Sequence, residues 1–170
     1  MIFLGIDPGL ASTGYGVVEG DGRAATIRDF GCIRTSPAQE TPDRLAHIYG
    51  AVLSVIREWK PEGVSMEDVF STPRIPRAAL QLGEVRGVLT LAVTQAGLKV
   101  LQLSARGVKQ ALTGSGAADK EQLERALRRM TGWTEAIRPS HASDALAIAI
   151  VGLSRWRTPG DNDSSSKGSA

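Results

Sequence analysis

Residues 2–9, Ile-Phe-Leu-Gly-Ile-Asp-Pro-Gly, decide the fold, because five apolar residues end abruptly at an acid and a turn. A continuous apolar run of this length is typical of a central strand that is buried on both faces of a sheet. Residues 15–19 predict a second strand, residues 20–22 a hairpin turn, and residues 24–34 a third strand. Since these connections are short, we predict that the first three strands pair antiparallel.

Helices and strands alternate in the rest of the chain. Apolar residues at helical spacing predict helices at 41–59, 75–96, 104–112, 119–130 and 139–156, and short apolar runs predict strands at 64–70 and 99–103. Thr41 or Asp43 is expected to cap the first helix, and Asp119 with Gln122 has the spacing of a capping box. This order predicts an α/β fold with a five-stranded mixed sheet flanked by helices.

Two glycines stand out inside the helix expected at 75–96. Gly83 and Gly87 lie one turn apart on one side of it, although glycine costs a helix about 1 kcal/mol relative to alanine. Their placement indicates that another backbone approaches closely. That backbone could belong to the same chain or to a second subunit.

Length and composition indicate one globular domain. We expect residues 1–157 to form it, and residues 158–170, rich in Pro, Gly, Asp and Ser, to be a disordered tail. No apolar run reaches the ~18 residues of a membrane span, and the N-terminus has no basic leader, so we expect a cytoplasmic protein. The single Cys32 excludes an internal disulfide and a cysteine-rich zinc site.

The charge is distributed unevenly along the chain. Residues 1–69 carry 6 basic and 10 acidic side chains, whereas residues 70–138 carry 11 basic and 5 acidic ones. A basic middle segment fits a surface that binds a polyanion. Solvated helix surfaces rich in Arg and Lys explain the same counts.

Four polar residues lie at the ends of predicted elements. Asp7 ends the first strand, Glu67 lies at or near the end of the fourth, and His141 and Asp144 share one face in the first turn of the last helix. Open α/β sheets place ligands at such strand ends. Taken singly, each residue also fits a turn, a solvated strand end or a helix start.

Carboxylates that are brought together repel one another unless cations lie between them. Mg²⁺ prefers oxygen ligands and leaves positions for substrate phosphates, and two ions about 4 Å apart can stabilise both the attacking and the leaving oxygen of a phosphoryl displacement. The set Asp7, Glu67, His141 and Asp144 is therefore a plausible two-metal site for phosphodiester hydrolysis, with the 3′-oxygen as leaving group.

Several segments, in this order, resemble the bacterial RuvC Holliday-junction resolvases, and the resemblance covers about residues 2–155. They are Leu4-Gly5-Ile6-Asp7-Pro8-Gly9, Thr13-Gly14-Tyr15-Gly16, Gly31-Cys32-Ile33-Arg34-Thr35, Glu67-Asp68-Val69-Phe70, Val108-Lys109-Gln110 and residues 143–149, Ser-Asp-Ala-Leu-Ala-Ile-Ala. The Gly-Ile-Asp-Pro-Gly element alone is only moderately specific. The whole set in a chain of this length is very specific.

The resemblance implies an RNase H-like fold, with helices on both faces of the sheet. It also implies a homodimer that cuts two opposed strands of a four-way DNA junction with Mg²⁺ or Mn²⁺, two ions per site, and that works with the RuvA and RuvB branch-migration proteins. Asp7, Glu67 and Asp144 match the family's acids, whereas His141 stands where a fourth acid is usual. Since nitrogen ligands suit Mn²⁺ better than Mg²⁺, we expect Mn²⁺ to support activity at least as well.

Five further residues are candidates for DNA binding. Phe70 matches a family aromatic that stacks on junction bases, although it could also be a core residue, and Lys109 and Lys120 match basic positions near the scissile phosphate. Arg74 and Arg77 open a helix and could contact backbone phosphates. A solvated surface would explain both arginines equally well.

Three other functions fit parts of the same pattern. The first glycine-rich segment also resembles the phosphate loop of actin-like sugar kinases and chaperone ATPases, but those proteins need two such domains. A module of the same fold that binds junctions without cutting them is thinkable, because His141 replaces an acid. A nuclease acting on RNA–DNA hybrids is the third alternative.

Overall fold

The computed structural model describes residues 1–21, 24–68 and 76–156. The strands are β1 (Ile2–Asp7), β2 (Ser12–Gly20), β3 (Ala25–Arg34), β4 (Gly63–Asp68) and β5 (Val100–Ser104). The helices are α1 (Thr41–Trp59), α2 (Pro76–Gln95), α3 (Ala105–Thr113), α4 (Lys120–Thr131) and α5 (Ser140–Arg155). No described helix is both long and apolar enough to cross a membrane.

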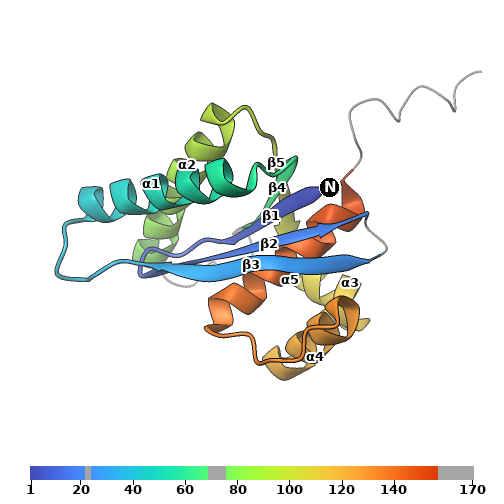
Figure 1. Cartoon of the computed structure of the whole chain (residues 1–170). Coiled ribbons are helices and arrows are strands. Elements are labelled where there is room, and N and C mark those ends of the chain that lie inside the picture. Colours follow the sequence, from blue (N-terminus) through green and yellow to red (C-terminus); the bar gives the residue numbers. More distant parts are fainter. Residues whose placement is uncertain (22–23, 69–75, 157–170) are drawn as a thin grey trace, which may run out of the picture.

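The five strands form one mixed sheet in the order β3-β2-β1-β4-β5 (Figure 1). β1 pairs antiparallel with β2, and β2 with β3, whereas β4 runs parallel to both β1 and β5. The predicted sheet, antiparallel in its first three strands and mixed overall, is confirmed. β1 is central, as its continuous apolar run indicates.

Helices cover both faces of the sheet (Figure 1), and each face has its own core. α1 and α2 cover one face, where Leu4 and Ile6 of β1 pack with Ile48, Val52 and Leu89. α3, α4 and α5 cover the other face. On this face the core includes Phe3 of β1, Leu103 of β5, Leu127 of α4, Leu146 of α5 and Ile137, which lies between α4 and α5.

The helix ends test the predicted caps. Asp119 and Gln122 form the predicted capping box at the start of α4: each side chain accepts from the other residue's backbone N–H. The predicted cap of α1 is wrong, because its N-cap is Glu40, and no side chain caps that end. Both Thr41 and Asp43 already lie within the helix, which starts with Pro42 in its first turn, where the missing N–H of proline costs nothing.

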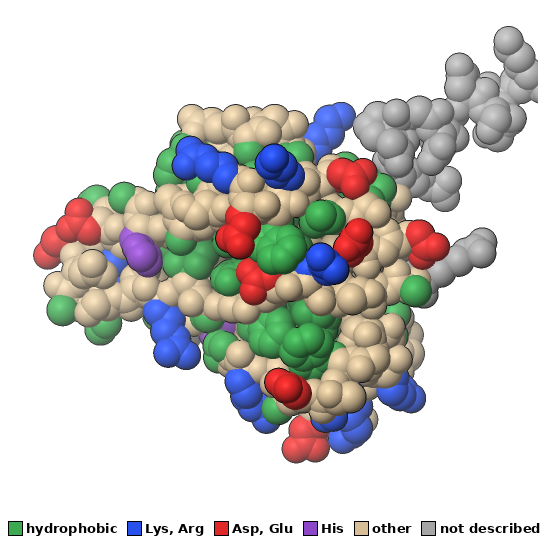
Figure 2. All heavy atoms as spheres, viewed as in Figure 1, with side chains coloured by type: hydrophobic (Ala, Val, Ile, Leu, Met, Phe, Trp, Pro, Cys, Tyr) green, Lys and Arg blue, Asp and Glu red, His purple; other side chains and the backbone are tan. Residues whose placement is uncertain are grey.

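An aromatic contact joins β3 to the segment after α4. Phe30 on β3 meets Trp133, just after α4, edge to face with ring centroids 5.6 Å apart. Figure 2 shows apolar side chains in this region, between the sheet and the α4 layer, and basic and acidic side chains together at the lower edge over α4.

Candidate active site

Asp7 and Glu67 lie at the carboxyl ends of neighbouring parallel strands. The register between β1 and β4 pairs Ile6 with Met66, so the next residue on each strand is one of the two acids. Asp7 is 9% exposed, whereas Glu67 is half-buried. The sheet itself therefore brings together two acids that are sixty residues apart in sequence.

Glycines on the sheet let α5 lie unusually close to it. A Cβ on Gly5 would lie 2.1 Å from the carbonyl oxygen of Ala145, and one on Gly14 would lie 2.0 Å from that of His141. Only glycine allows this approach of helix backbone to sheet backbone. Since His141 is in the first turn of α5, its close approach to β2 sets the position of the helix end that carries the remaining candidate ligands.

Asp7, His141 and Asp144 form a compact group. One potential ligand atom from each lies within 4.8 Å of the others. Nδ1 of His141 and Oδ2 of Asp7 share a hydrogen bond 2.6 Å long, although these residues are 134 positions apart. The Asp7 side chain is 13% exposed and that of His141 is 44% exposed, so the group has a buried base and an open side.

The three acids repel one another and are partly removed from water. Burial, together with the charges of Asp7 and Asp144, raises the pKa of Glu67 to about 7. Burial also raises the pKa values of Asp7 and Asp144 above their usual range. The hydrogen bond from His141 offsets part of the rise at Asp7. Such a set of under-compensated carboxyl groups attracts a cation.

Glu67 lies beside the compact group rather than within it. It lines one hollow of about 50 Å³ with Asp7, Pro8 and Leu82, and a second of about 30 Å³ that also touches Lys109 and Asp144. A water molecule occupies about 30 Å³ in the liquid, so each hollow has room for about one water-sized species. Glu67 lines both hollows.

Two of the predicted DNA-binding residues lie near this site. Lys109 lines a hollow with Glu67 and Asp144, and Lys120 lowers the pKa values of Asp7 and Asp144 through its charge. Both lysines come from the α3–α4 layer. The predictions for Phe70 and Arg74 lie outside the described residues, and Arg77 lies in the first turn of α2, where its side chain is not described.

Arg86 on α2 is a contact of this site that the sequence did not single out. Its guanidinium donates to the backbone carbonyl of Glu67 and lies 3.8 Å from Oδ1 of Asp68. It also lowers the pKa of Glu67 through its charge. Nothing in the sequence distinguishes it from neighbouring arginines, since only the fold places it against the end of β4.

A mixed five-stranded sheet with carboxylates at its central strand ends and at the start of the last helix defines an RNase H-like nuclease. The family model described as "Crossover junction endodeoxyribonuclease RuvC" matches residues 3–152. A protein of that name from Trichlorobacter lovleyi is 41% identical over 157 residues, which cover 92% of this chain and 87% of the relative. One from Pelotomaculum thermopropionicum is 39% identical over 150 residues, with 88% and 91% covered.

A solved structure agrees with these relatives. "T. thermophilus RuvC in complex with Holliday junction substrate" superposes with a TM-score of 0.83 at 38% identity, covering 88% of this chain and 91% of that one. The chain therefore belongs to the RuvC family of crossover junction endodeoxyribonucleases. The predicted family and RNase H-like fold are confirmed.

Proposed function

We propose that this chain resolves Holliday junctions by hydrolysing phosphodiester bonds in two opposed strands, in recombination and DNA repair. The observation that carries the proposal is the convergence of Asp7, His141 and Asp144 within 4.8 Å, with Glu67 on the adjacent strand. The T. thermophilus relative, 38% identical, is described in complex with a Holliday junction substrate. Membership of an endodeoxyribonuclease family supports the same reaction.

The donor set fits divalent cations. Three carboxyl groups with raised pKa values and an imidazole offer oxygen ligands and one nitrogen ligand to hard or borderline ions. We assign Asp7, Glu67, His141 and Asp144 as the residues that would hold Mg²⁺ or Mn²⁺, two ions per site. When bound, these ions would activate water and offset charge on the phosphate.

The chain's own residues have separate tasks in this scheme. The hydrogen bond between His141 and Asp7 fixes the orientation of both side chains. Lys109 and Lys120 add positive charge on the α3–α4 side, where it would stabilise the negative charge that develops on the phosphoryl oxygens. Phe70, Arg74 and Arg77 remain proposed DNA contacts.

We further propose that α2 supplies the surface of a homodimer. Leu80, Gly83, Gly87 and Leu91 follow one another at helical spacing on one face of α2, and Leu80 is 72% and Leu91 51% exposed. Apart from the adjacent residues and the backbone of α2 itself, no atom of the described residues lies within 4 Å of a Cβ placed on either glycine. The close approach that these glycines predict is therefore absent within the described part of the chain, which leaves a second subunit.

Light scattering tests the dimer. A Leu91→Glu substitution places a charge in the proposed interface, so we expect the wild-type chain to be dimeric and the variant to dissociate at micromolar concentration. A variant that keeps the wild-type mass at all concentrations would show that this face is not the interface. The proposal also includes that the chain works in the cytoplasm with the RuvA and RuvB branch-migration proteins.

Cleavage of a synthetic four-way junction tests the proposed function. The assay compares wild type, Asp7→Asn and the control Asp43→Asn, an exposed acid on α1. Asparagine keeps the shape of Asp7 but removes the charge that holds the cations. We expect Asp7→Asn to lose at least roughly a hundredfold in rate, since loss of a ligand's outer partner alone costs 10–100-fold.

Two further comparisons separate this function from its alternatives. A linear duplex and an RNA–DNA hybrid should be cut far more slowly than the junction, and Mn²⁺ should support cutting at least as well as Mg²⁺ because of His141. Tight junction binding by wild type without cutting in either metal would favour a non-catalytic binding module. Strong cutting in Mg²⁺ and none in Mn²⁺ would contradict the role of His141.

A further inference from the structure

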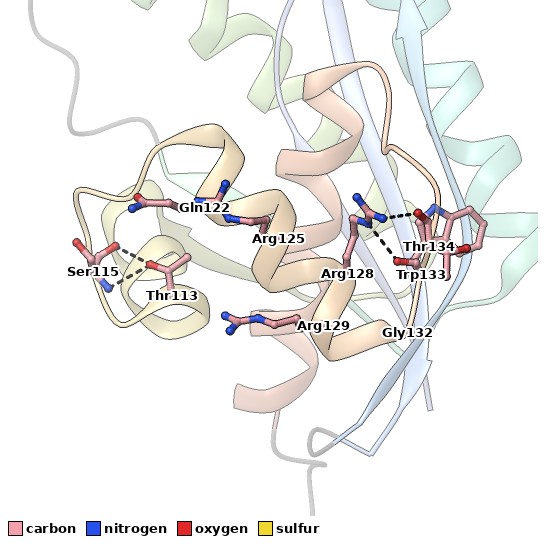
Figure 3. Close-up of a pocket in the computed structure, with 9 residues that line it drawn as sticks. All are labelled: Thr113, Ser115, Gln122, Arg125, Arg128, Arg129, Gly132, Trp133 and Thr134. Atoms are coloured by element: carbon pink, nitrogen blue, oxygen red, sulfur yellow. Dashed lines mark hydrogen bonds between the residues drawn. The ribbon is translucent and has the colours of Figure 1, made fainter.

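A broad groove lies along α4, and none of its lining residues belongs to the compact acidic group. We call it the α4 groove. It has a volume of about 720 Å³ and is lined by Thr113, Ser115, Gln122, Arg125, Arg128, Arg129 and the turn 132–134. Figure 3 shows the three arginines projecting from α4, with Thr113 and Ser115 on one side and Trp133 and Thr134 on the other.

The charge of this groove is positive. No acidic residue lines it, and three arginines do. Glu121 approaches Arg125 at 3.6 Å, but both side chains are largely exposed, and such a pair is weak. Arg129 makes no hydrogen bond or ion pair with any described residue. Exposed guanidinium groups of this kind bind phosphates well, because their planar donors match the phosphate oxygens.

Arg128 has a different task in the groove. It donates hydrogen bonds to the backbone carbonyls of Trp133 and Thr134. These contacts hold the turn after α4 in place as one wall, and no carboxylate among the described residues forms an ion pair with Arg128. The groove is thus a shaped surface with a fixed wall rather than a set of unconnected side chains.

The α4 groove and the proposed active site share two helices, α3 and α4. Thr113 lies one turn after Lys109 on α3 and donates to its carbonyl at 2.8 Å. Lys120 begins α4, and Arg129 lies nine residues later on the same helix. At 1.5 Å per residue, the rise along the axis of α4 from Lys120 to Arg129 is roughly 14 Å. That distance corresponds to about four base pairs at 3.4 Å each.

We propose that the α4 groove binds the phosphate backbone of one duplex arm of the junction, about four base pairs from the scissile phosphate. The inference rests on the proposed function and adds a second contact to it. Hydroxyl, amide and guanidinium groups dominate the lining, as in backbone contacts that position DNA without reading its sequence. A protein partner would call for apolar anchors at the centre of the contact, and Trp133 is the only large apolar residue in the lining.

The test is a double substitution of the two exposed arginines, Arg125→Gln with Arg129→Gln. The matched control removes two exposed charges elsewhere, Arg57→Gln on α1 with Lys99→Gln before β5. Binding of a labelled four-way junction is measured in EDTA, over a series of salt concentrations, so that the DNA is bound but not cut. Circular dichroism and the melting temperature check that each variant is folded.

We expect the double variant to bind about tenfold more weakly at low salt, and its plot of log Kd against log salt to be flatter by 1–2. The control should stay within about twofold of wild type, since surface charge far from the DNA contributes little. A junction whose arms carry neutral methylphosphonates at about the third to sixth linkage from the crossover should remove the difference between wild type and double variant.

The outcomes separate this inference from the function on which it rests. If wild type cuts the junction but the double variant binds with an unchanged Kd and salt slope, the groove does not contact DNA. That result is the one expected if an acidic protein segment occupies the groove. If wild type cuts no junction with Mg²⁺ or Mn²⁺, the proposed function itself fails, whatever the groove binds.

Discussion

The raised pKa of Glu67 predicts that the metal-free protein loses stability as the pH rises. Its carboxyl group titrates near 4.5 in an unfolded chain and at about 7 in the folded protein. Below the lower value both states are protonated, and the group costs nothing. Above about 7 both states are ionised, and the folded state bears the full cost of a carboxylate that is half-buried between Asp7 and Asp144.

The size of the effect follows from the same shift. Between about pH 5.5 and about pH 8, a pKa that moves from 4.5 to about 7 lowers the free energy of unfolding by about 2 kcal/mol. Solvent screens a half-buried group, so we halve this figure to about 1 kcal/mol. For a domain of this size, that is a fall of about 2–4 °C in melting temperature.

Thermal melts in EDTA at the two pH values measure this fall. Glu67→Gln should lose much of the pH dependence, whereas Glu40→Gln, an exposed glutamate outside the site, should keep it. Added Mg²⁺ should stabilise wild type more at the higher pH, because the ion binds the ionised carboxylates. The reasoning is refuted if the metal-free protein is equally stable or more stable at the higher pH, or if Glu67→Gln melts with the wild-type dependence.

Two substitutions test how the fold positions the site. Gly14→Ala should cost at least about 2 kcal/mol of stability and slow junction cutting, because its Cβ would collide with the carbonyl oxygen of His141. The control Gly50→Ala has open space around it and should be neutral or stabilising in denaturant unfolding. Equal effects at both glycines would contradict the close packing of α5 against the sheet. Arg86→Met should weaken Mn²⁺ binding, measured by calorimetry, by roughly tenfold, because Arg86 holds the strand end that carries Glu67. Arg86→Lys should restore part of this affinity. Unchanged Mn²⁺ affinity in Arg86→Met would show that Arg86 is only structural.

The sequence predicts the fold well where local signals are strong. The apolar run before Asp7 marks the central strand, and the spacing of Asp119 and Gln122 marks the start of α4 within one residue. β2 was predicted to begin at Tyr15 but begins at Ser12. Those first residues include the buried Thr13 and Gly14, which lies against α5, and the strand preference of Thr13 is offset by the glycine that follows it.

The site was predictable as a set of residues but not as a geometry. Element ends and the family resemblance pointed to Asp7, Glu67, His141 and Asp144, and the structure brings Asp7, His141 and Asp144 into one group with Glu67 beside it. Arg86 and the α4 groove were not predictable, because neither follows from local sequence. Each depends on which helix the tertiary fold lays against which strand end.

The replacement of an acid by His141 also has a physical logic that the geometry reveals. Asp7, Glu67 and Asp144 already have raised pKa values from burial, and the charges of Asp7 and Asp144 disfavour ionisation of Glu67. A fourth carboxylate at position 141 would add another repelling charge beside Asp7, whereas the imidazole makes a hydrogen bond of 2.6 Å to Asp7 that lowers the pKa of Asp7. Compared with a carboxylate, the histidine removes one negative charge that would attract cations, and it also reduces the repulsion among the acids in the metal-free protein.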